Sequence, residues 1–147
     1  GLRISNGTII SKQKKISWWR TFLIKDNKAS IKKLGPWKKN NTISFDIQSG
    51  PKLIINNKIP KLKDDYANRT AIGIRKDKHV IILVTENSFI TTSEVASFMK
   101  NTLQCSDAIN LDGGGSSQMS IQSTDFSYQV SGLTKVSDPI CLFKKQQ

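Results

Sequence analysis

The sequence predicts an α+β fold: a twisted, mostly antiparallel β-sheet with a βαβ crossover and one or two helices packed on it. Its 147 residues are the size of one domain, so we expect residues 1–147 to form a single unit. Short strand-like runs, separated by clusters of Asn, Gly, Pro and Lys, dominate the first half. The second half contains an apolar run, a capped helix and another apolar run, which is the order of a βαβ unit.

Five short strands are expected in the first half of the chain. They are Gly7–Ser11, Thr21–Lys25, Ala29–Leu34, Thr42–Ile47 and Lys52–Asn56. The pairs Asp26-Asn27 and Asn56-Asn57 consist of residue types that tolerate positive φ. We therefore predict a two-residue turn at each pair.

The second half begins with a predicted β-hairpin. Its strands, Arg69–Arg75 and Val80–Glu86, flank a turn over residues 76–79. The run Val80–Val84 is apolar throughout and rich in β-branched residues. Such a run is typical of a central strand that is covered on both faces.

A helix is expected after this hairpin. Thr91 and Glu94 have the spacing of a capping box, in which a hydroxyl caps the first turn and the acid reaches back. Apolar residues then recur at helical spacing, which predicts that they pack in the core. These residues are Val95, Phe98, Met99 and Leu103. A further buried strand is expected over Ala108–Leu111.

The two strands of a βαβ unit run parallel, so their carboxyl ends lie at one edge of the sheet. Ligands of open sheets of this kind bind at that edge. Glu86 ends the first of these strands and Asp112 follows the second. The two acids are candidates for a general acid/base or acid/nucleophile pair, or alternatively are two solvated strand-end acids.

Positive charge is concentrated in the first half of the chain. Residues 1–63 contain 15 of the 23 basic residues and two of the 11 acidic ones. Such a segment attracts anionic polymers or phosphorylated substrates, or is simply a solvated Lys-rich surface. We favour the solvated surface and do not expect a nucleic-acid partner. No apolar run approaches the roughly 20 residues that span a bilayer.

Neither the cysteines nor the histidine predict a metal centre, and we expect no resident cofactor. Cys105, Cys141 and His79 lack the spacing of a zinc site. A disulfide between the two cysteines requires neighbouring strands, which the sequence leaves open. A Ca²⁺ ion between Asp112 and Glu86 stays an alternative, although no Asp-x-Asp-x-Asp-Gly loop is present.

A run of three glycines follows the last predicted strand. The segment reads Asn110-Leu111-Asp112-Gly113-Gly114-Gly115-Ser116-Ser117. Glycines let backbone N–H groups approach a ligand without obstruction by a side chain. If Ser116 and Ser117 open a helix, its N-terminus would favour an anion. The run lacks the Lys of a Walker loop and does not fit GxGxxG.

Three blocks of the sequence together resemble the phosphodiester glycosidase family. They are Gln48-Ser49-Gly50-Pro51, Arg69-Thr70-Ala71-Ile72-Gly73 and Asn110–Ser117, and their order and spacing match over residues 43–120. The resemblance implies a secreted or periplasmic bacterial enzyme that hydrolyses a sugar-1-phosphodiester, such as one of N-acetylglucosamine. Family members usually carry Asp where this chain has Glu86. Their domains also begin earlier, so residues 1–147 are expected to lack the family's N-terminal segment.

The resemblance implies a role for each matching residue. Arg69 would stabilise the phosphate leaving group, and Asp112 or Glu86 the oxocarbenium-like centre or the attacking water. Asn110 and Gln48 would bind sugar hydroxyls. The remaining expected substrate-binding residues are Ser49, Gly50, Thr70, Gly113, Gly114, Gly115, Ser116 and Ser117.

Structural alternatives exist for these residues. Arg69 would instead form an ion pair with Asp112 or Glu86, and Asp112 would accept the amides of the glycine loop. Asn110 would cap the end of its strand, and Ser116 would be only a helix cap.

Three functions therefore stay open. The leading hypothesis is hydrolysis of a glycosidic phosphodiester or a related envelope glycoconjugate. The alternatives are a non-catalytic carbohydrate- or phosphoglycan-binding domain and a polyanion-binding module built on the basic half. Binding by a polyanion module would fall steeply with salt and survive Asp112→Asn, whereas a hydrolase would lose turnover. The sequence does not indicate the oligomeric state.

Overall fold

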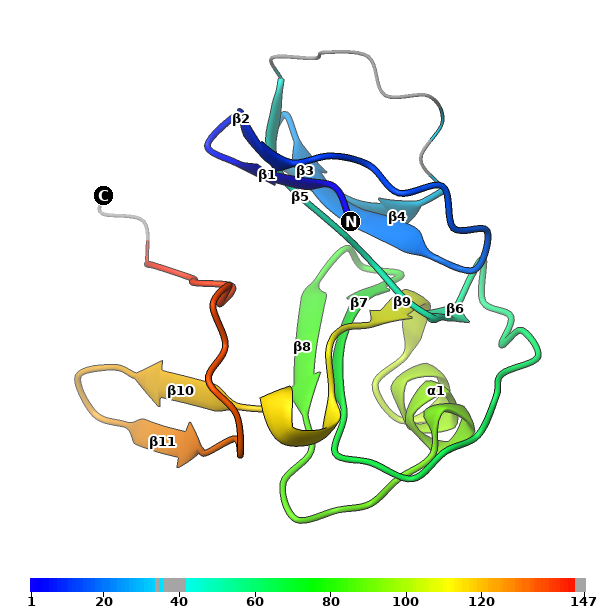
Figure 1. Cartoon of the computed structure of the whole chain (residues 1–147), viewed down its shortest axis with the longest axis vertical. Helices are drawn as coiled ribbons and strands as arrows, with labels where there is room; N and C mark the ends of the chain where they lie inside the picture. The colour runs from blue at the N-terminus through cyan, green and yellow to red at the C-terminus, as the bar shows by residue number, and fades with distance from the viewer. Residues whose placement is uncertain (34, 36–41, 145–147) are drawn as a thin grey trace.

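A computed structural model describes residues 1–33, 35 and 42–144 of the chain. These residues form two stacked β-sheets, an α-helix behind the second sheet and a separate β-hairpin (Figure 1). Every pair of neighbouring strands among them is antiparallel. The predicted α+β fold with a mostly antiparallel sheet is confirmed.

The first sheet has five strands in the order β2-β1-β5-β3-β4. They are β1 (Arg3–Ser5), β2 (Thr8–Ser11), β3 (Arg20–Lys25), β4 (Lys28–Lys32) and β5 (Ile43–Ser49). Asp26 and Asn27 have φ angles of 49° and 58°, which confirms the turn predicted between β3 and β4. The strand expected over Ala29–Leu34 corresponds to β4, and Leu34 lies outside the described residues.

The second sheet has four strands in the order β6-β9-β7-β8. They are β6 (Lys52–Ile54), β7 (Thr70–Arg75), β8 (Val80–Val84) and β9 (Cys105–Asn110). The predicted hairpin of β7 and β8 is confirmed by the pairing of Thr70 with Val84. Because β7 is antiparallel to both β8 and β9, those two strands run parallel to each other with β7 between them.

The prediction that Val80–Val84 is a central strand is wrong, since β8 lies at the end of the sheet order. The apolar sequence has another cause. Ile82 packs into the cluster between the two sheets, and Ile81 and Leu83 pack into the cluster beneath the helix. Both faces of β8 are partly covered, so an edge strand in this position has the same apolar sequence pattern as a central strand.

The helix α1 (Thr92–Asn101) begins with the predicted capping box. Thr91 Oγ1 accepts a hydrogen bond from Glu94 N at 3.1 Å, and Glu94 Oε2 accepts one from Thr91 N at 2.8 Å. The inner face of the helix buries Val95 and Met99 against the second sheet, whereas Phe98 is 45% exposed, so the prediction that Phe98 packs in the core is wrong. The cap therefore fixes where the helix starts, and the apolar stripe fixes which side faces the sheet.

Two apolar clusters of the core separate three layers, and a third, smaller cluster of Leu2, Ile4 and Ile43 lies within the first sheet region. Between the sheets lie Phe22, Ile72, Ile74, Ile109 and Leu111. Between the second sheet and α1 lie Leu53, Ile54, Ala71, Val95, Ala96, Met99, Cys105 and Ala108. The second sheet is thus covered on both faces, which holds its strand ends rigidly and makes its edge a suitable place for a site.

The segment that follows β9 differs from the helix considered in the sequence analysis. Instead of a helix opened by Ser116 and Ser117, there is a single 3₁₀ turn over Gly114–Ser116. It leads into a hairpin of β10 (Met119–Gln122) and β11 (Ser127–Val130), whose strands pair only with each other among the described residues. The condition for a helix N-terminus at Ser116 and Ser117 is therefore not met, because strand β10 begins only two residues after Ser117.

Two smaller expectations concern the cysteines and the membrane. Cys105 is buried and Cys141 is exposed, and neither forms a disulfide. Among the described residues, no helix is long and apolar enough to cross a bilayer.

Candidate active site

The three sequence blocks meet at one edge of the second sheet. Strands β8 and β9 end there and β7 begins there, so Glu86, Asp112 and Arg69 all follow or precede strands at this edge. The block that ends at Pro51 joins them, because Pro51 O accepts a hydrogen bond from Asn110 N at 2.9 Å. The tertiary structure therefore assembles the predicted residues in one region.

The glycine loop lies directly on the backbone that precedes β7. Leu111 N donates to Thr70 O at 2.8 Å, and Gly114 N donates to Asn68 O at 2.7 Å. A Cβ atom on Gly113 would lie 2.9 Å from Asn68 O, so any larger residue would push the two segments apart. Gly114 has a φ of +60°, which favours glycine.

Most backbone amides of this loop are already used inside the protein. Gly113 N donates to Asp112 Oδ1 at 3.1 Å, and Gly114 N donates to Asn68 O. Ser116 N and Ser117 N donate within the 3₁₀ turn at 3.2 Å each. The loop thus differs from the open anion nest that the sequence suggested, and Asp112 accepts one of its amides, as the structural alternative expected.

Hydroxyl groups surround the loop. Thr70 Oγ1 donates to the buried Ser117 Oγ at 3.2 Å, which ties the start of β7 to the end of the loop. Ser116 Oγ lies 3.3 Å from Thr134 Oγ1, and Gly115 O accepts from Thr134 N at 3.0 Å. Thr134 follows the hairpin and was not predicted, because nothing in the local sequence places it beside the glycines.

The two acids are exposed side chains at the rim of this edge. Glu86 Oε2 accepts a hydrogen bond from the Tyr128 hydroxyl at 2.8 Å. This bond and the charge of Glu86 raise the pKa of the Tyr128 phenol above its usual range. Among the described residues, no group of three His, Cys, Asp or Glu side chains is placed to hold a metal ion.

Arg69 is buried beneath the rim and its guanidinium is held by protein groups. Nε donates to Ile90 O at 3.0 Å, and Nη2 donates to Asp65 Oδ1 at 3.0 Å and also to Asp65 O. Its ion pair is therefore with Asp65, rather than with Asp112 or Glu86 as the structural alternative expected. Direct contact of Arg69 with a phosphate stays a prediction.

Gln48 is likewise buried and joins the N-terminal segment to β5. Its Oε1 accepts from Leu2 N at 3.0 Å and from Lys14 N at 2.9 Å, and its Nε2 donates to Lys14 O at 2.7 Å. Ser49 is paired with Arg20 in the sheet. At Gly50 a Cβ atom would lie 2.5 Å from Trp19 Cδ1, so glycine is required by close packing. Contact of these residues with a substrate also stays a prediction.

Asn110 differs from Gln48 because only the nitrogen of its side-chain amide forms a hydrogen bond. The side chain is buried at the end of β9, and its Nδ2 donates to Leu111 O. Its Oδ1 is buried and has no hydrogen-bond partner. An unpaired buried acceptor costs about 1–3 kcal/mol, so a ligand hydroxyl that donates to this atom would be favoured.

Asn68 is a residue of this edge that the sequence did not reveal. Its backbone oxygen accepts from Gly114 N, and its Oδ1 accepts from Ser88 N at 3.1 Å. It therefore links the glycine loop to the loop that carries Glu86. A single Asn before a strand carries no signal that distinguishes it from an ordinary turn residue.

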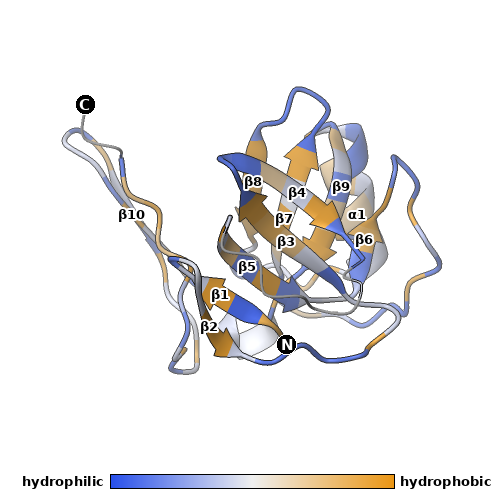
Figure 2. Cartoon of the chain, turned by 90° about the horizontal axis from the view of Figure 1, so that it is seen from above, coloured by the Kyte–Doolittle hydropathy of each residue, from blue (hydrophilic) through white to orange (hydrophobic). Residues whose placement is uncertain are grey.

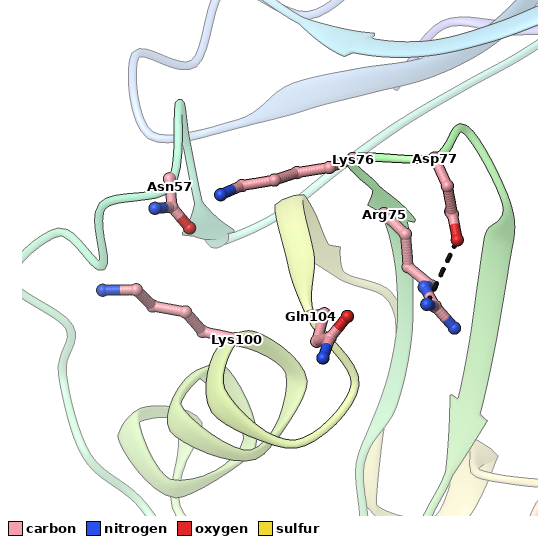
Figure 3. Close-up of a pocket in the computed structure, with 6 residues that line it drawn as sticks. All are labelled: Asn57, Arg75, Lys76, Asp77, Lys100 and Gln104. Carbon is pink, nitrogen blue, oxygen red and sulfur yellow. Dashed lines mark ion pairs between the residues drawn. The ribbon is translucent and has the colours of Figure 1, made fainter.

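A cavity of about 410 Å³ lies at the opposite end of β7. It is lined by Asn57, Arg75, Lys76, Asp77, Lys100 and Gln104 (Figure 3). Arg75 forms an ion pair with Asp77, and the amines of Lys76 and Lys100 extend toward Asn57. At a rise of roughly 3.3 Å per residue, the five steps along β7 from Thr70 to Arg75 separate this cavity from the candidate site by about 17 Å.

Comparison with known proteins identifies this arrangement. Residues 1–143 match the family described as phosphodiester glycosidase. The chain therefore belongs to the phosphodiester glycosidase family, which is a family of glycoside hydrolases. A comparison with curated protein sequences finds no match.

Two solved structures resemble the fold. The zebrafish N-acetylglucosamine-1-phosphodiester alpha-N-acetylglucosaminidase catalytic domain, auto-inhibited by its pro-peptide, matches with a TM-score of 0.69 and 23% identity. The match covers 80% of this chain and 47% of that chain, so the present chain spans about half of the zebrafish chain's length. A hypothetical protein from Synechocystis matches with a TM-score of 0.43 and 14% identity, over 68% of this chain and 29% of that one.

Proposed function

We propose that this chain hydrolyses a sugar-1-phosphodiester, at the bond between the anomeric carbon and the phosphate oxygen. Family membership supports a glycosidase, and one observation supports this edge as its site. Asp112 and Glu86 are exposed just after the ends of β9 and β8, which run parallel on either side of β7, and Asn110 at the end of β9 has a buried Oδ1 without a hydrogen-bond partner. Because the zebrafish relative is named for N-acetylglucosamine-1-phosphodiester, diesters of that sugar are the first substrates to test.

The proposed reaction needs a base for water and a negative charge beside the sugar. The carbon–oxygen bond breaks, the phosphate monoester leaves with the electron pair, and a water oxygen joins the anomeric carbon. We assign the water proton to Glu86, since Tyr128 holds only one of its oxygens. Asp112, whose Oδ1 is fixed by Gly113 N, faces the positive charge that develops on the sugar.

In this proposal, uncharged side chains orient the substrate. Asn110 turns its side-chain amide toward the ligand, so that its Oδ1, which has no partner in the protein, accepts a sugar hydroxyl. The exposed hydroxyl of Ser116 donates to the departing phosphate oxygens. A phosphate monoester is already a stable anion, so the leaving group needs hydrogen-bond donors more than it needs a strong acid.

Release of N-acetylglucosamine from its methyl-phosphodiester tests this function. The wild-type chain is compared with Asp112→Asn and with Asp125→Asn, an exposed acid at the hairpin tip. We expect turnover that falls by about 10²–10⁴ in Asp112→Asn and is unchanged in Asp125→Asn. A well-folded wild-type chain without turnover would contradict the proposal for this substrate.

A non-catalytic sugar-binding domain is the second candidate. It is favoured by one observation, namely that Arg69 and four amides of the glycine loop are engaged within the protein. Such a domain would bind the sugar without turnover. Sugar binding measured at two salt concentrations separates it from a polyanion-binding module, whose affinity would fall steeply with salt.

A further inference from the structure

The hairpin of β10 and β11 has two chemically different faces. Directly opposed residues share a face and successive residues alternate, and the register pairs Met119 with Val130 and Ile121 with Tyr128. These four residues form one face, which Phe126 extends toward the turn. The other face carries only Ser120, Gln122, Ser127 and Gln129.

The apolar face is covered at the base of the hairpin and bare at its tip. Val130 is buried, whereas Ile121, Tyr128 and Phe126 are 42%, 46% and 56% exposed. The rings of Phe126 and Tyr128 are nearly parallel, at an angle of 14° and a centroid distance of 6.4 Å. Figure 2 shows the hairpin projecting from the body of the molecule. An exposed, ordered aromatic pair of this kind marks a binding surface.

The same face is continuous with the candidate active site. The Tyr128 hydroxyl donates to Glu86 Oε2 at 2.8 Å, a charge-assisted bond between the hairpin and the loop after β8. Whatever contacts the ring of Tyr128 therefore lies beside Glu86. The polar face contains no group that the site uses.

We propose that Phe126 and Tyr128 form the wall on which the sugar ring of the substrate stacks, and that the Tyr128 hydroxyl positions Glu86. This inference rests on the proposed function. A pyranose has an apolar face of C–H groups and a rim of hydroxyls, so it matches a flat aromatic pair beside polar side chains. Tyr128 is then a positioning residue for the acid and, with Phe126, a specificity-determining residue for the sugar.

The size of the bare surface favours a sugar over a second copy of the chain. A fully buried aromatic side chain covers roughly 150–250 Å², so three half-exposed side chains offer on the order of 300 Å². A stable protein interface needs roughly 800 Å² from each partner. A single sugar ring covers an area of the smaller size.

Four variants test the wall in the N-acetylglucosamine methyl-phosphodiester assay. Phe126→Ala and Tyr128→Ala remove rings, Tyr128→Phe removes only the hydroxyl, and Gln122→Ala on the polar face is the matched control. We expect a KM increase of about tenfold in Phe126→Ala with little change in kcat. We expect Tyr128→Phe to lower kcat and shift its pH profile with little change in KM. Unchanged kinetics in all three aromatic variants would overturn the inference.

Two further readouts do not depend on turnover. Binding of free N-acetylglucosamine, followed by NMR, is expected to weaken in Phe126→Ala and not in Gln122→Ala. The chain has two tyrosines, so an absorbance titration resolves Tyr128, whose pKa is expected to fall in Glu86→Gln. If the wild type binds the sugar without turnover, the proposed hydrolysis is refuted, but the inference that Phe126 and Tyr128 bind the sugar ring is supported. If the chain forms a concentration-dependent dimer that Phe126→Ala abolishes, the aromatic face binds a second copy of the chain, and the inference of a sugar-binding wall is overturned.

Discussion

The exposed acids at the rim of the candidate active site and the buried polar residues of the sequence blocks use their side chains in opposite ways. At the rim, Asp112 and Glu86 are exposed, and each accepts one hydrogen bond that leaves a second carboxylate oxygen for other partners. By contrast, Gln48 in β5 and Arg69 just before β7 are buried, and each side chain makes three hydrogen bonds to protein groups. The candidate site residues thus divide into buried ones that hold the structure together and exposed ones that are free to react.

This difference predicts that rim substitutions change turnover and that substitutions beneath the rim change stability. Glu86→Gln is expected to have the largest effect, a fall in kcat of about 10²–10⁴, because an amide still accepts from Tyr128 but takes up no proton. Its thermal midpoint is expected to stay close to that of the wild type. Steady-state kinetics and thermal unfolding measure the two quantities, and an unchanged kcat would contradict the division.

Arg69→Met should act mainly on stability. The substitution removes the partners of Ile90 O and Asp65, and we expect a loss of about 3 kcal/mol in the free energy of unfolding. Urea unfolding measures it, with the exposed Lys61→Met as the control. If Arg69→Met lost turnover but kept its stability, Arg69 would contact the substrate, and the assignment of buried polar residues to a structural role would be wrong.

Asp46 supplies a pH-dependent test of buried polar groups within the first sheet. It is 1% exposed, Thr21 donates to its Oδ1, and its Oδ2 has no partner. Burial raises its pKa from an ordinary 3.8 to about 6. Its folded pKa exceeds the unfolded one, so the stabilisation is present below pH 4 and lost as the pH rises through 6.

The expected size of this loss is at most about 3 kcal/mol between pH 4 and pH 7. Asp64, Asp77, Glu94 and Asp138 have lowered pKa values and change stability in the opposite direction. The measurement is therefore the difference in urea stability between the wild type and Asp46→Asn at each pH. A difference that does not vary with pH would refute the buried carboxyl's role.

The glycine loop offers the smallest effects. Gly114→Ala meets no atom within 4 Å but must keep a φ of +60°, so we expect a loss of about 1 kcal/mol. Gly113→Ala additionally meets Asn68 O and should cost roughly 1–3 kcal/mol and displace Asp112. Parallel unfolding curves and turnover assays compare the two. Equal losses in both variants would mean that the close approach to Asn68 does not matter.

Local sequence signals predicted much of the fold correctly. The capping box of Thr91 and Glu94, the Asn-rich turns and the hairpin of β7 and β8 depend on neighbouring residues, and all are present. The position of β8 was predicted wrongly, because an apolar run reports covered faces and not sheet order. A helix opened by Ser116 and Ser117 was one possibility, but the strand that follows leaves room for a single turn.

By itself the sequence determined the residue types of the site, its strand-end acids and its family. Only the tertiary structure decided which of these side chains are free, since a hydrogen bond from Lys14 to Gln48 or from Arg69 to Ile90 joins segments that no motif connects. The contact of Tyr128 with Glu86 spans 42 residues and depends on the hairpin passing beside the loop that follows β8. Such contacts are absent from local patterns because packing creates them.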